Sequence, residues 1–344
     1  MERLRREHPE LKILLTFFSP SGYEVRKNYE GADIICYLPL DTYFNARRFL
    51  NLVHPEVAFF IKYEFWWNYL HILKRRNVPV YSVSSIFRPN QVFFRWYGRT
   101  YSNVLKCFTR FFVQNEVSRQ LLAKLGITEV EITGDTRFDR VLDICWQAKD
   151  LPLVKAFKQD AKVLVAGSSW APDEDLIIPY FNAHPEMKLV LAPHVVSEDH
   201  LKEIEGKLRR PFVRYSRVTE ESAARADCLI IDGYGLLSSI YRYGEMAYVG
   251  GGFGVGIHNT LEAATFGLPI AFGPNYEKFK EARDLVTLGA ATPIHSYEEL
   301  KTWFTPLRDD EHLLQQCSRI AKDYTTAHQG ATNIVLHTVF GKPE

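Results

Sequence analysis

The stretch Tyr248-Val-Gly-Gly-Gly-Phe-Gly-Val-Gly-Ile-His-Asn-Thr-Leu-Glu-Ala-Ala-Thr-Phe-Gly-Leu-Pro269 decides the fold of the second half of this 344-residue chain. Residues 245–249 form an apolar run, five glycines follow among residues 250–256, and residues 268–272 form another apolar run. Between them, Asn259 is a favourable helix N-cap, and Glu262 completes a capping-box pattern. The stretch therefore predicts a strand, a glycine loop, a helix and the next strand.

The glycine loop favours a bound anion. Glycines such as Gly251 and Gly252 let a ligand approach the backbone, and the N–H groups at the start of the helix attract negative charge. The spacing fits neither the dinucleotide fingerprint G-x-G-x-x-G nor the phosphate loop G-x-x-x-x-G-K-[ST]. A tight strand-to-helix turn without a ligand is the alternative interpretation.

The composition is typical of a globular protein, since 46% of residues are hydrophobic and 24% are charged. The length of 344 residues is typical of two domains. A net charge of +1 gives no general attraction for nucleic acid. The five cysteines lack C-x-x-C spacing, which argues against a zinc site or a disulfide framework. No apolar run approaches the roughly 18–20 residues of a membrane-spanning helix, so we expect the chain as written to be soluble.

Apolar strand patterns alternate with helical patterns along the whole chain, which predicts parallel sheets covered on both faces. We expect a first domain at residues 1–145, a crossover linker at 146–160 and a second domain at 161–344, with a last helix that can pack on the first domain. Two such domains describe the GT-B glycosyltransferase architecture, with two Rossmann-like sheets facing a central cleft. The chain enters at the end of a helix, so we expect the first domain to lack its N-terminal strand.

Residues 88–112 interrupt the alternation, because aromatic and basic side chains interleave there at helical spacing. This pattern fits a surface that meets anionic lipid. It fits equally well a helix that faces the core and leaves its arginines in solvent.

Polar loops after the strands of the second domain are candidates for holding a nucleotide, with N–H groups for phosphate and the Glu262 carboxylate for ribose. Capping alone also explains Glu262, and His194 can be an ordinary loop residue. The candidates are Ser168, Ser169, Pro193, His194, Tyr234, Gly235, Asn259, Thr260, Leu261 and Glu262.

Three charged residues outside these loops are candidates for chemistry. Lys62 and Glu64 flank the end of a first-domain strand, where an acid beside a base suits proton transfer, although a surface ion pair is the simpler reading. Arg137 lies near the domain crossover and can meet a carboxylate or a phosphate.

Several motifs resemble the Kdo transferase family, which transfers 3-deoxy-D-manno-octulosonic acid (Kdo). The match runs through nearly the whole chain in order and spacing. The motifs are Ser19-Pro-Ser-Gly22, Lys62-Tyr-Glu-Phe-Trp-Trp-Asn68, Gln114-Asn-Glu116, Thr133-Gly-Asp-Thr-Arg-Phe-Asp139, Val249-Gly-Gly-Gly252, His258-Asn-Thr-Leu-Glu-Ala-Ala264 and Gly273-Pro-Asn-Tyr-Glu-Lys-Phe279.

The resemblance implies a GT-B enzyme at the cytoplasmic face of the bacterial inner membrane that moves Kdo from CMP-Kdo to a lipid A precursor. It implies inversion at the anomeric centre and no metal or other cofactor. By the same resemblance, the CMP site comprises Pro193-His194, Tyr234-Gly235-Leu236 and Asn259–Glu262, and Arg137 with Lys62 or Glu64 stabilises charge in the transition state.

The chain departs from the family pattern at His194, where arginine is frequent, at Leu236, where an acid is frequent, and at Lys62, where the family has an acid. The family's membrane anchor and the Ser-x-Gly-Glu loop with its general base do not occur in this sequence. We therefore expect the chain as written to be nearly inactive, with Glu64 as the nearby substitute for the base. The rival readings are a UDP-sugar transferase or 2-epimerase, and a catalytically silent nucleotide-binding protein.

Overall fold

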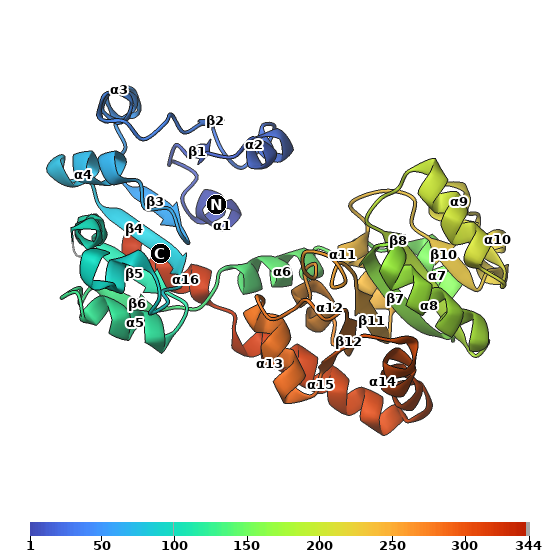
Figure 1. Ribbon diagram of the computed structural model, residues 1–344. Coiled ribbons are helices and arrows are strands. Elements are labelled where there is room, and N and C mark those ends of the chain that lie inside the picture. Colours follow the sequence, from blue (N-terminus) through green and yellow to red (C-terminus); the bar gives the residue numbers. More distant parts are fainter. Residues whose placement is uncertain (99, 342–344) are drawn as a thin grey trace. The chain divides into compact units, whose positions relative to one another are not determined.

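The computed structural model describes residues 1–98 and 100–341, which divide into two compact units (Figure 1). Unit 1 comprises Met1–Thr136 and the chain from Gly330 on, and unit 2 comprises Arg137–Gln329. All the strand pairs in the described chain are parallel, so the prediction of parallel α/β sheets is confirmed. None of the described helices has the length and apolar character that crossing a membrane requires.

Unit 1 contains two parallel sheets, a pair β1-β2 and a four-stranded sheet in the order β3-β4-β5-β6. Its strands are β1 (Leu14–Phe17), β2 (Ile34–Tyr37), β3 (Ala58–Ile61), β4 (Val80–Ser85), β5 (Arg110–Val113) and β6 (Val130–Ile132). Its α-helices are α1 (Glu2–Glu7), α2 (Pro20–Arg26), α3 (Tyr43–Val53), α4 (Trp67–Arg75), α5 (Glu116–Ala123) and α16 (Ala331–Phe340).

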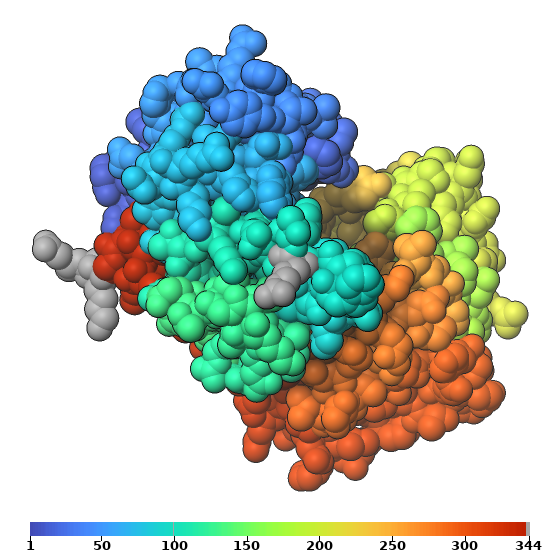
Figure 2. Space-filling view, turned by 60° about the vertical axis from the view of Figure 1, so that its left-hand side comes forward, coloured from blue at the N-terminus to red at the C-terminus, as the bar shows by residue number. Residues whose placement is uncertain are grey.

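The last helix, α16, covers one face of the four-stranded sheet. Val335 packs with Val83 of β4 and Phe112 of β5, and the Phe340 ring lies 6.1 Å from that of Phe59 on β3. Figure 2 shows this red segment against the blue and green surface of unit 1. Burial of one such side chain stabilises a fold by roughly 1.5–3 kcal/mol. These contacts make α16 part of the core of unit 1.

The aromatic and basic segment does not form the single helix that its spacing suggested. It folds as three 3₁₀ turns, η1 (Val92–Phe94), η2 (Trp96–Gly98) and η3 (Tyr101–Cys107). Phe93 is buried, whereas Trp96 is 90% exposed and Tyr97 is 63% exposed. Phe93 of η1 therefore faces the core and the rings of η2 face solvent, while contact of this segment with lipid stays a prediction.

Unit 2 is built on one seven-stranded parallel sheet in the order β13-β12-β11-β7-β8-β10-β9. Its strands are β7 (Lys162–Ser169), β8 (Met187–Pro193), β9 (Phe212–Arg214), β10 (Cys228–Ile230), β11 (Met246–Val249), β12 (Ile270–Phe272) and β13 (Ala291–Pro293). Its helices are α6 (Arg137–Trp146), α7 (Pro152–Lys158), α8 (Ala171–Ala183), α9 (Glu198–Lys207), α10 (Glu220–Arg225), α11 (Leu237–Ile240), α12 (Leu261–Thr265), α13 (Lys280–Leu288), α14 (Tyr297–Asp309) and α15 (Glu311–Ala327), with 3₁₀ turns η4 (Tyr215–Arg217) and η5 (Tyr241–Tyr243).

Both faces of this sheet are covered, as the continuous apolar strands predict. Successive side chains of a strand point to opposite faces, and on β7 Val163 and Val165 enter one apolar cluster while Leu164 and Ala166 enter the other. All four side chains are fully buried. The sheet therefore presents its strand ends, not its faces, to ligands.

The predicted crossover linker at residues 146–160 is wrong. Helix α7 lies within it, and Val154 and Phe157 of that helix are fully buried in the core of unit 2. The Leu151 N–H donates to the Tyr243 hydroxyl at 2.7 Å, which fixes the start of the helix. Of the lysines that suggested a linker, Lys155 is exposed on this helix, whereas Lys158 is half-buried and forms an ion pair with Glu245. The unit boundary falls at Arg137.

Candidate functional site

The loops after β7, β8 and β11 meet at one edge of the unit 2 sheet. The chain runs outward from β7 through β8 and returns to β11 on the other side of β7, so the strand order reverses between β7 and β11. Open parallel sheets bind ligands at the carboxyl ends of strands beside such a reversal. The His194 N–H donates to the Ser169 carbonyl at 2.8 Å, which joins the first two loops. The predicted residues at this edge are Ser168, Ser169, Pro193, His194, Gly251 and Gly252.

Close backbone packing explains two glycines of the loop after β11. A Cβ on Gly250 would lie 2.2 Å from the Ser168 carbonyl oxygen, and a Cβ on Gly252 would lie 2.6 Å from the Gly273 Cα. Gly251 has φ +93°, a conformation that side chains rarely adopt. The fold therefore requires these glycines whether or not a ligand is bound. Within the described residues, the N–H groups of Gly252 and Phe253 donate no hydrogen bond, which makes them candidates for contact with an anion.

Asp173 on the first turn of α8 ties the loops together. Its buried carboxylate accepts from the Trp170 N–H at 2.9 Å, the Gly251 N–H at 3.0 Å and the Tyr248 hydroxyl at 2.7 Å. Burial, with the Asp173 charge second, raises the pKa of the Tyr248 hydroxyl, so that hydroxyl stays a donor. Asp173 was not predicted as a site residue, although an acidic side chain three residues after the N-cap, here Trp170, is a helix-start signal.

Three aromatic rings from three loops lie in contact at this edge. The His194 ring stacks on Trp170 with centroids 4.6 Å apart and on His258 with centroids 4.5 Å apart. The Trp170 indole N–H donates to Nε2 of His258 at 3.2 Å. Trp170 and His258 were not predicted as site residues, because stacking between side chains so far apart in sequence leaves no local pattern.

The start of α12 differs from the predicted capping box. The helix has only five residues, its N-cap position is Thr260, and the side-chain oxygen Oδ1 of Asn259 accepts from the Leu261 N–H at 3.2 Å. The Asn259 side-chain amide donates to the Glu262 carboxylate at 3.0 Å, which is not the backbone contact of a capping box. A helix this short carries little of the dipole that we had assigned to it.

Two groups beside α12 are polar and poorly satisfied. Burial raises the pKa of the Glu262 carboxyl, while the hydrogen bond from Asn259 lowers it. Thr260 is buried, and its Oγ1 has no hydrogen-bond partner in the described chain. Buried polar groups normally find partners, so the Thr260 hydroxyl is unusual, whereas the half-buried Glu262 carboxylate keeps some exposed surface for hydroxyl or amide groups of a ligand.

The other predicted residues of unit 2 have mixed surroundings. Tyr234 is 76% exposed and Gly235 has φ +86° in the loop after β10, whereas Leu236 packs against the apolar core. The Ser169 hydroxyl donates to the buried Glu174 carboxylate at 2.9 Å, so it is already engaged. Of these four, Tyr234 has the most freedom to meet a ligand.

Unit 1 has its own polar cluster at the carboxyl ends of β3–β6. Lys62, with φ +61°, places its ammonium 3.4 Å from the buried Asp135 carboxylate. The Gln114 side-chain amide donates to the same carboxylate at 3.2 Å. Lys62 therefore pairs with Asp135, and the predicted pairing of Lys62 with Glu64 is wrong. Asp135 and Gln114 occur in the recognised motifs, but the sequence alone assigned them no role.

Glu64 and Arg137 each have another partner. The exposed Glu64 carboxylate accepts from the Trp66 indole N–H at 2.5 Å. In unit 2, the Arg137 guanidinium forms an ion pair with the buried Glu281 carboxylate, with oxygens at 3.0 and 3.4 Å. A guanidinium held by two oxygens is well oriented, and its charge is already balanced.

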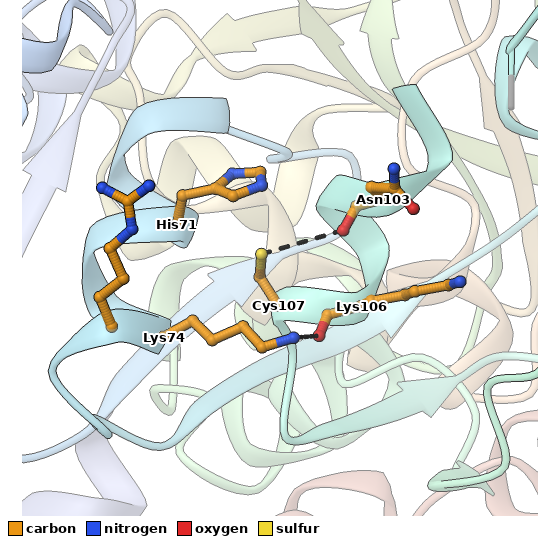
Figure 3. A pocket seen from close by; sticks show the side chains of 6 residues that line it. His71, Lys74, Asn103, Lys106 and Cys107 are labelled. Carbon is orange, nitrogen blue, oxygen red and sulfur yellow. Dashed lines mark hydrogen bonds between the residues drawn. The ribbon is translucent and has the colours of Figure 1, made fainter. Parts of the chain in front are cut away.

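A separate shallow groove of about 380 Å³ lies between α4 and η3 of unit 1. Figure 3 shows Lys74 donating to the Lys106 carbonyl, at 2.7 Å, beside His71 and Cys107. None of the predicted site residues lines this groove. Across the described residues, no group of three or more His, Cys, Asp and Glu side chains is arranged to hold a metal ion.

Comparison with solved structures defines the fold class. UDP-GlcNAc 2-epimerase from Neisseria meningitidis, solved with UDP-GlcNAc bound, aligns over 99% of this chain and 96% of its own with a TM-score of 0.69. The two share 15% sequence identity, so this likeness concerns the fold. The protein therefore has the GT-B fold of nucleotide-sugar enzymes.

Sequence comparison finds similarity to one family of glycosyltransferases. Residues 1–140 match the family model described as 3-deoxy-D-manno-octulosonic-acid transferase (kdotransferase). The chain is 27% identical over 315 residues to 3-deoxy-D-manno-octulosonic acid transferase of Aquifex aeolicus, covering 89% of this chain and 80% of that protein. The enzyme of the same name from Haemophilus influenzae is 26% identical over 309 residues, with coverages of 86% and 72%. The resemblance to the Kdo transferase family is confirmed, and this chain is a relative of those glycosyltransferases.

Proposed function

We propose that this protein is a glycosyltransferase that moves Kdo from CMP-Kdo to a lipid A precursor, in lipopolysaccharide biosynthesis. The observation that carries the proposal is the meeting of three strand-end loops at the β7–β11 reversal of unit 2, in a relative of Kdo transferases. That edge offers the open N–H groups of Gly252 and Phe253 for phosphate. Beside α12, Glu262 and Thr260 offer partners for ribose or base.

The proposed reaction is a single displacement with inversion. An acceptor hydroxyl oxygen attacks the anomeric carbon of Kdo, the bond from that carbon to the phosphate oxygen breaks, and CMP leaves with the electron pair. Backbone N–H groups stabilise the charge that develops on the phosphate, so the step needs no metal. The exposed Glu64 carboxylate is the proposed acceptor of the hydroxyl proton, and Lys62 and Arg137 are the groups proposed to stabilise charge in the transition state.

We further propose that the protein contacts the cytoplasmic face of the bacterial inner membrane, where a lipid acceptor would be presented. The surface of η2 supports this, since Trp96 and Tyr97 are exposed directly after the exposed Arg95, and Arg88 is exposed in the same segment. Aromatic rings at headgroup depth and arginines near anionic lipid both favour peripheral binding.

Calorimetry with CMP and UMP tests the donor assignment. Wild type is expected to bind CMP more tightly than UMP. Glu262→Ala is expected to weaken CMP roughly 10- to 100-fold, because hydrogen bonds to a charged group are worth about 1.5–3 kcal/mol. Glu299→Ala, on the exposed start of α14, is the control and should bind as wild type does. Preference for UMP would instead favour a UDP-sugar enzyme, and a folded protein that binds neither nucleotide would contradict the proposal.

A further inference from the structure

The contact between Trp170 and His258 has a consequence for the protonation of His258. An indole N–H can only donate a hydrogen bond, so Nε2 of His258 must accept with its lone pair. In a neutral imidazole the proton then resides on Nδ1. This state is supported by burial, which lowers the pKa of His258, and by the neighbouring His194, whereas the charge of Asp173 opposes it.

The surroundings of the ring hold it in one orientation. The Nε2 edge lies against Gly251, where a Cβ would come within 3.0 Å of Cδ2 and 3.2 Å of Nε2. One face of the ring stacks on His194, with an interplanar angle of 25°. The imidazole is therefore fixed by a hydrogen bond at one edge and a ring on one face.

The opposite edge of the ring carries the Nδ1–H. In the described chain this nitrogen has no protein partner, and it is not among the buried side-chain atoms that lack one, so it reaches solvent. His258 joins the glycine loop to Asn259, and its backbone N–H donates to the carbonyl of Gly250 at 3.0 Å, at the start of the loop whose N–H groups we propose for phosphate. A donor at this position complements an anion there.

We propose that Trp170 is a positioning residue, which holds His258 as the Nδ1–H tautomer and so makes it a directed hydrogen-bond donor to the phosphate of the nucleotide. The tautomer follows from the geometry alone, whereas the identity of the anion rests on the proposed function. Trp170 comes from the loop after β7 and His258 from the loop after β11, so the contact spans the strand reversal.

The test compares Trp170→Phe with wild type in the full chain labelled with ¹⁵N at histidine. Phenylalanine keeps a ring to stack on His194 but cannot donate. Nuclear magnetic resonance of the imidazole nitrogens should show Nδ1–H for His258 in wild type, assigned by the loss of its signals in His258→Gln. In Trp170→Phe the proton should move partly or wholly to Nε2. Trp146→Phe, at an exposed tryptophan of the same unit, should leave the tautomer unchanged.

Titration with CMP completes the test. Trp170→Phe should bind CMP roughly 2- to 10-fold more weakly at unchanged melting temperature, as expected for one neutral hydrogen bond that is no longer directed. An Nε2–H tautomer in wild type, or the same tautomer and CMP affinity in Trp170→Phe, would overturn the inference. If wild type binds no nucleotide, the proposed function fails, and the tautomers alone then decide the role of Trp170.

Discussion

Replacing Gly252 by alanine should damage the candidate site through the backbone alone. The added Cβ would lie 2.6 Å from both Cα and N of Gly273, whereas carbon atoms in contact normally stay about 3.5–4.0 Å apart. The overlap of about 1 Å is with backbone at the end of β12, which cannot rotate away. Overpacking of this kind costs about 1–3 kcal/mol.

The matched control is Gly254→Ala in the same loop, where the nearest atom to an added Cβ is the Gly251 carbonyl oxygen at 3.6 Å. That change should be neutral or slightly stabilising, because alanine restricts the unfolded chain. For a domain of this size, 1 kcal/mol shifts the melting temperature by roughly 2–4 °C, so Gly252→Ala should melt roughly 2–12 °C lower.

Differential scanning calorimetry of the full chain measures this, and two compact units are expected to unfold in separate transitions. The loss should be confined to the transition of unit 2, and CMP affinity should fall with it. Equal melting temperatures for Gly252→Ala and Gly254→Ala would refute the claim that backbone packing, not ligand approach, requires this glycine.

Three further predictions test other parts of the structure. Phe157→Ala should lower the free energy of unfolding, measured by chemical denaturation, by about 3–5 kcal/mol, because this side chain is fully buried. The control Lys155→Ala should lower it by at most about 0.5 kcal/mol. Equal effects of the two changes would support residues 146–160 as a linker. Burial raises the folded-state pKa of Glu262, so the stability it contributes is present at low pH and is lost as pH rises through that pKa. Glu262→Gln should therefore raise the melting temperature at pH 8 but not at pH 4, and a gain at pH 4 instead would contradict this sign. Replacing Trp96 and Tyr97 by serine should weaken binding to anionic liposomes at least about tenfold, and unchanged binding by a folded variant would exclude η2 as the contact.

The sequence predicted the sheets well because continuous apolar strands such as β7 carry a strong local signal. It failed at residues 146–160, where a seven-residue helix with two buried side chains is too short to show periodicity. The prediction of a single helix at residues 88–112 also failed. In the 3₁₀ turns that form there, Phe93 points to the core and Trp96, three positions later, points to solvent.

The sequence predicted which loops form the candidate site, but it did not predict which side chains contact one another there. Strand ends marked Pro193-His194 and the glycine loop, since parallel strands end at one edge. The side-chain pairs that organise the site, Asp173 with Gly251 and Trp170 with His258, join residues about 80 positions or more apart. No single-sequence pattern reports such pairs, because they depend on which strands become neighbours.

The position of α16 in unit 1 has a consequence for synthesis of the protein. Unit 1 is begun by the first 136 residues but is completed only by residues after 330, whereas unit 2 is one continuous segment. At about 5–20 residues per second, a ribosome needs roughly 10–40 s to translate the intervening segment. During that time the face of β3–β5 that receives Val335 and Phe340 has no cover from α16. Unit 2, although synthesised later, is thus the first unit that can finish folding. Unit 1 is the part of the nascent chain that a chaperone would need to protect.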